Sequence, residues 1–260
     1  MMLRYPISMG ERLYAIFWGP LLVVAFIAIV TGFFAHLPPE HELISFDTLV
    51  LATLATCARL AVAYVIAVAI AIPLCLFVTS SAAAEAIFLP VFDVLESVPI
   101  LALFPVFILV FIQFGALNAA AIAILTLAML WNLVFTVVGG IKVIPRDIID
   151  AAHVFGLSKF SFLRRVLLPA VIPQFVTGSI LAIAQGWNII IVAEVLHTYI
   201  PGGTSAQDLF GIGAILVQAS ATGQTQLFLW AVFMMVVVIA VFNFFVWQKL
   251  LHFAQRFRFD

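Results

Sequence analysis

Apolar residues are grouped along the chain into six long runs that short polar stretches separate. An α-helix needs about 20 mostly apolar residues to cross a hydrocarbon core of about 30 Å. The pattern therefore predicts an all-α integral membrane protein with about six transmembrane helices. We expect these helices over about 17–35, 49–78, 87–114, 117–141, 170–197 and 226–249. Several runs exceed the required length, so tilted or bent helices are expected.

The third run, 87–114, contains three prolines: Pro90, Pro99 and Pro105. Proline removes a backbone donor and clashes with the preceding turn, so we expect this segment to be bent or broken. Irregular backbone at membrane depth is tolerated only against protein or a water-filled cavity. We therefore expect the third segment to lie inside the helix bundle.

Charge supports the membrane assignment and indicates an orientation. Charged residues make up 9% of the chain and the mean hydropathy is +1.28, whereas a soluble globular domain has about 25% charged residues. With the N-terminus inside, the expected inner segments carry Arg4, Arg12, Lys142, Arg146, Lys159, Arg164, Arg165, Lys249, Arg256 and Arg258. The expected outer loops carry no Lys or Arg. The positive-inside rule thus predicts a multi-pass protein with both termini in the cytoplasm.

The N-terminal run has an alternative interpretation as a cleavable signal peptide, because Arg4 and Arg12 precede it. The run is longer than a signal core of about 7–15 residues, and the stretch from His36 to Pro38 offers no small-x-small cleavage site. We therefore expect residues 1–47 to form a cytoplasmic segment, the first transmembrane helix and an outer loop.

The polar interruption between the fourth and fifth runs has the pattern of two short helices. Apolar residues recur at helical spacing at Ile148, Ile149, Ala152 and Phe155. This spacing predicts a helix over about 146–155 with one apolar face, and we expect that face to pack on a partner. Gly156 can supply the left-handed turn that ends the helix, and Ser158 can cap the next one. An alternative is a pair of amphipathic helices on the lipid surface.

The same stretch has rigid motif spacing. An acidic residue, two alanines, a glycine, an aliphatic residue and Leu-Pro stand at Asp150, Ala151, Ala152, Gly156, Val166, Leu168 and Pro169. This spacing resembles the EAA loop of binding-protein-dependent ABC importer permeases, with Asp in place of Glu. In that family the loop docks on the ATPase, which implies a coupling role here for Asp150, Ala151, Ala152, Phe155, Gly156, Leu168 and Pro169.

Further stretches resemble the nitrate, sulfonate, taurine and bicarbonate subgroup of these permeases. They are residues 89–107 with its three prolines, Trp187 with Val192-Ala193-Glu194, and Gly211-Ile212-Gly213, while residues 53–59 (TLATCAR) resemble the opening of the core helices in the family as a whole. The chain departs from the subgroup pattern at Glu96 and Ser97, where an Arg-Pro pair is usual, and at Asn188. The resemblance covers about residues 48–250 and implies a permease core over 48–260, with a cytoplasmic coupling loop at about 142–169.

The resemblance implies a type I ABC importer permease that forms the path for a small anion or organic acid. The implied partners are an ATP-binding ABC subunit, a second permease copy or similar permease, and an extracytoplasmic substrate-binding protein. The implied location of the chain is the plasma (inner) membrane. ATP and magnesium would bind to the partner subunit, so no cofactor is expected in this chain. An ion-gradient-driven secondary transporter or channel is the alternative, although no inverted repeat is visible.

Polar residues within the apolar runs are candidates for the translocation path. They are Arg59, Asp93, Glu96, Asn132, Gln185, Asn188 and Glu194. Charged groups at membrane depth face the bundle interior and pair with one another. Asp93 and Glu96 are three residues apart and share a helix face, so we expect Arg59 to pair with one of them. The alternatives are an orienting charge without solute contact for Arg59, and interhelical hydrogen bonding for the amides.

Enzymatic chemistry has little support in the sequence. The chain has no Gly-Lys-Ser or Gly-Lys-Thr phosphate loop, and no nucleophile with a matched base is visible. Its five histidines stand near expected helix ends and have no metal-ligand spacing. We therefore expect a non-enzymatic chain with no metal site and no nucleic-acid partner.

Overall fold

A computed structural model describes residues 45–200 and 202–257; the expected first helix at 17–35 lies outside the described residues. The regular elements of the described part are helical. They are α2 (Phe46–Val78), α3 (Ala82–Ser97), α4 (Ile100–Ile112), α5 (Leu117–Lys142), α6 (Arg146–Val154), α7 (Lys159–Phe162), α8 (Leu168–Glu194), α9 (Ile212–Ala221), α10 (Thr225–Phe242) and α11 (Gln248–Ala254). Short π-helical turns at Leu163–Leu167 and Asn243–Trp247 join α7 to α8 and α10 to α11.

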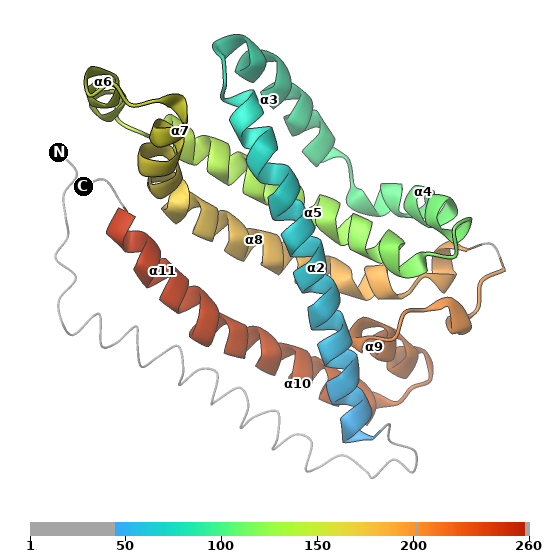
Figure 1. Cartoon of the computed structure of the whole chain (residues 1–260). Coiled ribbons are helices and arrows are strands. Elements are labelled where there is room, and N and C mark those ends of the chain that lie inside the picture. Colours follow the sequence, from blue (N-terminus) through green and yellow to red (C-terminus); the bar gives the residue numbers. More distant parts are fainter. Residues whose placement is uncertain (1–44, 201, 258–260) are drawn as a thin grey trace.

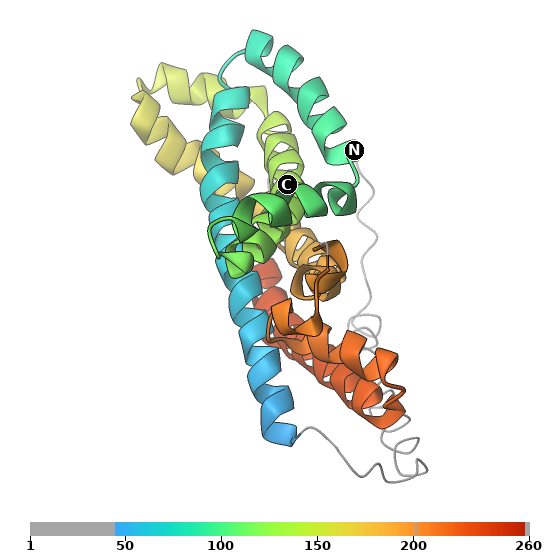
Figure 2. The same ribbon diagram turned by 90° about the vertical axis from the view of Figure 1, so that its right-hand side faces the viewer.

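The expected membrane helices are confirmed for the part of the chain that is described. Four helical runs there are long and apolar enough to span a bilayer: Phe46–Val78, Leu117–Lys142, Phe160–Glu194 and Thr225–Phe257. The bent pair α3 and α4 supplies a fifth span if its two halves are counted together. Figures 1 and 2 show these helices as an elongated bundle, with α6 and α7 at one end and α9 at the other. We call these two ends the α6 end and the α9 end.

The third segment is broken where its prolines predict. The axes of α3 and α4 meet at 85°, and Val98 and Pro99 form the junction. Pro99 stands at the N-cap of α4, where its missing N–H removes no helical hydrogen bond. The sequence thus predicts the break correctly.

The prediction that this segment lies inside the bundle is wrong for the single chain. Among the residues of α3 and α4, all described, Phe92, Phe104 and Ile108 are buried, and most of the others are half-buried or exposed. The membrane rule requires irregular backbone to be covered, but it does not specify by what. Residues 45–200 and 202–257 do not supply this cover.

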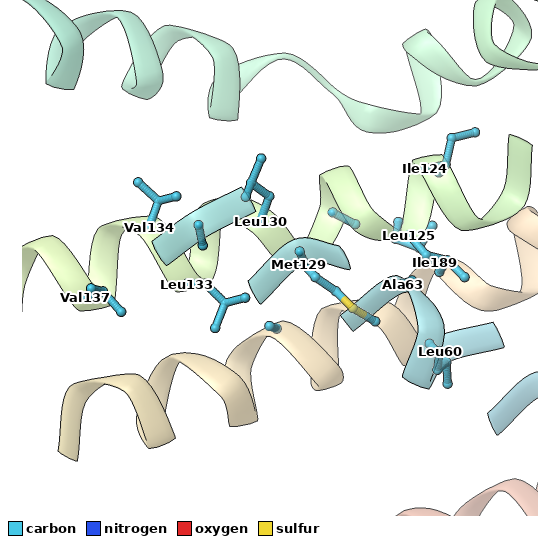
Figure 3. Close-up of a cluster of buried hydrophobic side chains, with 14 of the residues drawn as sticks. Leu60, Ala63, Ile124, Leu125, Met129, Leu130, Leu133, Val134, Val137 and Ile189 are labelled. Carbon is cyan, nitrogen blue, oxygen red and sulfur yellow. The ribbon is translucent and has the colours of Figure 1, made fainter. Parts of the chain in front are cut away.

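The core is centred on α5, which packs against α8 and α2. Most of the buried side chains of α5 are aliphatic, and Leu60 and Ala63 of α2 belong to the same buried cluster (Figure 3). Ala63, Ala67 and Ala71 of α2 are at most 1% exposed. Small residues let membrane helices approach closely, and association in lipid depends on such contact because there is no hydrophobic driving force between helices.

Glycines of α8 permit the closest approach to α5. A Cβ atom at Gly178 would overlap the Thr136 hydroxyl and lie 3.2 Å from the Asn132 carbonyl oxygen. A Cβ atom at Gly186 would overlap the end of the Met129 side chain. These two positions therefore set the distance between α5 and α8.

We expect Gly178→Val to destabilise the helix bundle by about 1–3 kcal/mol, because the added side chain forces the two helices apart. Gly139→Val is the matched control, since a Cβ atom at Gly139 meets nothing within 4 Å. Thermal unfolding of the purified protein in detergent measures both variants. Equal melting temperatures for the two would contradict the role of Gly178 in this contact.

Candidate functional site

The loop at the α6 end has the predicted helix–corner–helix geometry. Helix α6 ends within one residue of its expected boundary, and Gly156 follows it with φ = 63°. The Ser161 N–H donates to the Ser158 Oγ atom at 3.3 Å, which is the expected cap of the second helix. Beyond that cap the chain runs as continuous helix from Phe160 into α8, so the corner is joined directly to a membrane span.

The apolar face of α6 is divided between the chain's own core and the surface. Ala152 is 4% exposed, and Ile148 and Ile149 are half-buried against the core. The prediction that Ile148 and Ala152 pack on a partner is therefore wrong for these two side chains, because they are covered to a large extent within the chain itself.

The exposed apolar groups of the loop are concentrated at the corner. Val154, Phe155 and Phe160 are 85%, 81% and 70% exposed. The other predicted coupling residues, Asp150, Ala151, Gly156 and Leu168, are exposed, and Pro169 is half-buried in the first turn of α8. Large apolar side chains with this exposure at a helix corner are typical of a protein contact surface.

A buried ion pair lies near the α9 end of the bundle. Arg59 of α2 pairs with Glu194, the last residue of α8, and their side chains are 7% and 0% exposed. The prediction that Arg59 pairs with Asp93 or Glu96 is therefore wrong. Both of those carboxylates are exposed on α3 and have no ion-pair partner among the described residues. Linear spacing along the chain cannot reveal that the end of α8 lies beside the middle of α2.

The Glu194 carboxylate also binds the N-terminus of α9. Its Oε2 atom accepts from the Gly213 N–H at 2.7 Å, and its Oε1 atom accepts from the Thr56 hydroxyl at 2.7 Å. Unpaired N–H groups and the helix dipole make a helix N-terminus favourable for a negative charge. A Cβ atom at Gly211 would overlap the carboxylate, so glycine is needed there for this approach.

Arg59 makes further contacts to the protein. Its Nε atom donates to the Asn118 Oδ1 atom at 2.9 Å, and its Nη2 atom donates to the Phe210 carbonyl oxygen at 3.4 Å. Together these bonds join α2, α5, α8 and the segment before α9. The guanidinium of Arg59 is thus held by three protein groups, which favours an orienting charge over solute contact, and its role stays a prediction.

A cavity of about 430 Å³ lies where the broken segment passes over α5 and α8. Its polar lining residues are Glu96, Ser97, Trp131, Asn132 and Gln185. The structure thus brings three of the predicted path residues together: Glu96, Asn132 and Gln185. Asp93, Asn188 and Glu194 are not part of this lining.

Sequence reasoning missed several residues of these two sites. Thr56 lies one turn before Arg59 on α2, so its place on the same helix face is a signal that periodicity could have revealed. Asn118 and the peptide groups of α9 carry no such signal, because their role depends on how distant segments meet. Trp131 contacts Phe92 and also lines the cavity.

Three features of the structure are typical of a polytopic membrane transport protein. They are the long apolar helices, the broken span beside a polar cavity and the exposed helical corner. Residues 71–259 match the family described as "Binding-protein-dependent transport system inner membrane component", and the chain belongs to this family.

Individual relatives have related names. The chain is 31% identical to the nitrate import permease protein NrtB of Leptolyngbya laminosa, over 60% of this chain and 55% of that protein. It is 31% identical to the bicarbonate transport system permease protein CmpB of Synechococcus elongatus, over 58% and 53% of the two chains. It is 28% identical to the taurine transport system permease protein TauC of Escherichia coli, over 55% and 50%. The chain thus covers about half the length of these relatives.

Replacement of either charge at the buried pair leaves the other charge uncompensated. We therefore expect Arg59→Met and Glu194→Gln each to reduce the stability of the folded protein by roughly 3–5 kcal/mol. The double variant should be less destabilised than the sum of the two, by about 1 kcal/mol or more. Unfolding in detergent, followed in a double-mutant cycle, measures this coupling.

The matched cycle pairs Arg59→Met with Glu96→Gln. Because Glu96 has no ion pair with Arg59, the two effects should add. Coupling of Arg59 to Glu96 and independence from Glu194 would contradict the observed arrangement.

Proposed function

We propose that this chain is the membrane-spanning permease subunit of an ATP-driven importer and forms the path for a small solute. The observation that carries the proposal is the exposed helical corner at Phe155 and Gly156, which continues as unbroken helix into α8. A partner that binds and moves the corner would displace a membrane span with it, because a helix transmits motion along its axis. Membership of the binding-protein-dependent family supports the same function.

The proposed partner at the corner is an ATP-binding ABC subunit. Val154, Phe155 and Phe160 offer it an apolar surface, and the exposed Arg164 and Arg165 lie one turn further on. ATP and magnesium would bind to that subunit. In this proposal the chain itself is not an enzyme, and ATP-driven closure of the two ATPases moves the corners together and changes the access of the cavity.

We propose that the α6 end lies in the cytoplasm, and that both termini of the chain are cytoplasmic. Lys142, Arg146, Arg164, Arg165 and Arg256 belong to segments at this end, whereas the described loops at the α9 end contain no Lys or Arg. Positive charge near span ends favours the cytoplasmic side. The α9 end would then face outward, toward a substrate-binding protein.

The α9 end is suited to such docking because its loop is fixed at several points. The His197 ring binds Asp208 at 2.7 Å, and the Leu209 N–H donates to the Glu194 carbonyl oxygen at 2.9 Å. Phe210 stands beside these contacts and is 53% exposed. A preordered surface binds with a smaller entropic cost than a flexible one.

A second permease copy, or a similar permease, would complete the path. The junction at Val98 and Pro99 is exposed on the single chain, and irregular backbone cannot face lipid. Two such chains that face each other across their α3–α4 segments would enclose the junctions and the cavities between them. We propose that the enclosed path carries a small anion or organic acid, as the names of the nitrate, bicarbonate and taurine permeases suggest.

The importer function is tested in proteoliposomes that contain the chain, its ATP-binding subunit and its binding protein. Solute uptake should require ATP and the loaded binding protein. Uptake by the chain alone, driven by an ion gradient, would instead support a secondary transporter or channel and contradict the proposal.

Single cysteines test the corner contact and the orientation together. In a chain with Cys57 and Cys75 replaced by alanine, Phe155→Cys should crosslink to the ATP-binding subunit and resist an impermeant thiol reagent added outside. Phe114→Cys is the matched control, because Phe114 is 76% exposed at the α9 end. It should react from outside and form no such crosslink. The reverse pattern would overturn both the orientation and the docking site.

The corner glycine should be needed for coupling rather than for folding. Gly156 has φ = 63° and Gly115 has φ = 64°, and a Cβ atom at either position meets nothing within 4 Å. Gly156→Val and Gly115→Val should therefore add a similar backbone strain of roughly 1–2 kcal/mol. We expect Gly156→Val to lower binding-protein-stimulated ATP hydrolysis several-fold at normal membrane levels, and Gly115→Val to retain it. Equal hydrolysis by both variants would contradict a coupling role.

A further inference from the structure

The cavity over α5 and α8 has one carboxyl side chain in its lining, that of Glu96. Glu96 lines the cavity and is exposed, and it makes no ion pair or hydrogen bond with another described residue. Gln185 likewise makes none, and one N–H of the Asn132 amide remains free after its 3.4 Å bond to the Ala128 carbonyl oxygen. The wall therefore offers one carboxylate, amide donors and the ring of Trp131.

No described cation is placed to neutralise this carboxylate. The cavity lining includes no Lys or Arg among the described residues. Arg59 is held by Glu194, Asn118 and the Phe210 carbonyl oxygen. Lys142 lies at the α6 end and pairs with Glu85 at 2.6 Å. The negative charge of Glu96 is thus uncompensated within the described chain.

Such a cavity discriminates by charge. In surroundings less polar than water, an uncompensated carboxylate attracts a positive group and repels a negative one more strongly than it would in solution. A simple inorganic anion brings only negative charge to this wall. An organic acid that also carries an ammonium group brings its own counter-charge to Glu96.

We propose that the solute of this permease is a small zwitterionic organic acid, and that Glu96 recognises its ammonium group. This proposal rests on the proposed function. The face of Trp131 adds a cation–π contact to the ammonium group, and the amide N–H groups of Asn132 and Gln185 donate to the acid group. The volume of about 430 Å³ lies in the range of small-molecule sites. The proposal narrows the solute from any small anion to one that carries both charges.

The charge preference of the cavity is measured with thiol reagents that carry the two groups of interest. Gln185→Cys places a thiol in the lining, in a chain with Cys57 and Cys75 replaced by alanine. Aminoethyl and sulfonatoethyl methanethiosulfonate are then reacted with the purified importer complex in detergent. The rate of each reagent with the cysteine at position 185 is divided by its rate with a small free thiol. We expect this normalised rate to be about tenfold higher for the ammonium reagent than for the sulfonate reagent.

Glu96→Gln, which keeps the shape of the side chain, should abolish that preference. Asp47→Asn is the matched control, because Asp47 is an exposed carboxylate at the start of α2 that does not line the cavity and does not adjoin Glu96. It should leave the preference unchanged. Equal reaction of the two reagents, or a preference that Glu96→Gln does not change, would overturn the proposal.

The same complex separates this proposal from the function on which it rests. Binding-protein-stimulated ATP hydrolysis reports on the importer function irrespective of the solute. If hydrolysis is stimulated and the transported solute is nitrate or bicarbonate, the zwitterion proposal fails and the importer function stands. If hydrolysis is not stimulated by any loaded binding protein, the proposed function fails instead.

Discussion

A buried carboxylate is stable in a membrane bundle only where positive charge and hydrogen-bond donors surround it. Glu194 is fully buried and obtains these partners from Arg59 and Thr56 of α2 and from the Gly213 N–H of α9. Arg59 in turn reaches Asn118 at the start of α5. The positions of α2, α5, α8 and α9 at this end of the bundle therefore depend on the neutralisation of one side chain. The cavity lies further along α5 and α8, so its shape depends on how these two helices are placed.

A second constraint is that irregular backbone must be kept from lipid. The 85° bend between α3 and α4 creates the cavity wall, and it also leaves the junction at Val98 and Pro99 uncovered on the single chain. In the function proposed above, this one feature would form the wall of the solute path and the surface that a second permease covers. The two ends of the bundle differ accordingly: the α9 end is fixed by charge and hydrogen bonds, whereas the α6 end presents an apolar corner on a continuous helix.

Much of the architecture could be predicted because it depends on local chemistry. Long apolar runs are helical in a bilayer, a run with three prolines is expected to bend or break, and Gly156 permits a left-handed turn. The structure confirms the spans in its described part, the break at Pro99 and the positive φ of Gly156. Glu96, Asn132 and Gln185 lie together in the lining of one cavity, and their role as path residues stays a prediction.

The sequence by itself determined the class of the protein, the approximate span boundaries and the helical corner, because each of these depends on residues close together in the chain. Only the tertiary structure decided that Arg59 pairs with Glu194 rather than with Asp93 or Glu96. It also decided that Ala152 faces the core while Phe155 stays exposed. The choice of an ion-pair partner depends on which distant helix segments meet. The sequence pattern alone is compatible with several partners for the same charge. Burial removes that freedom, because a charge in the bundle interior must be matched by the groups that packing places next to it.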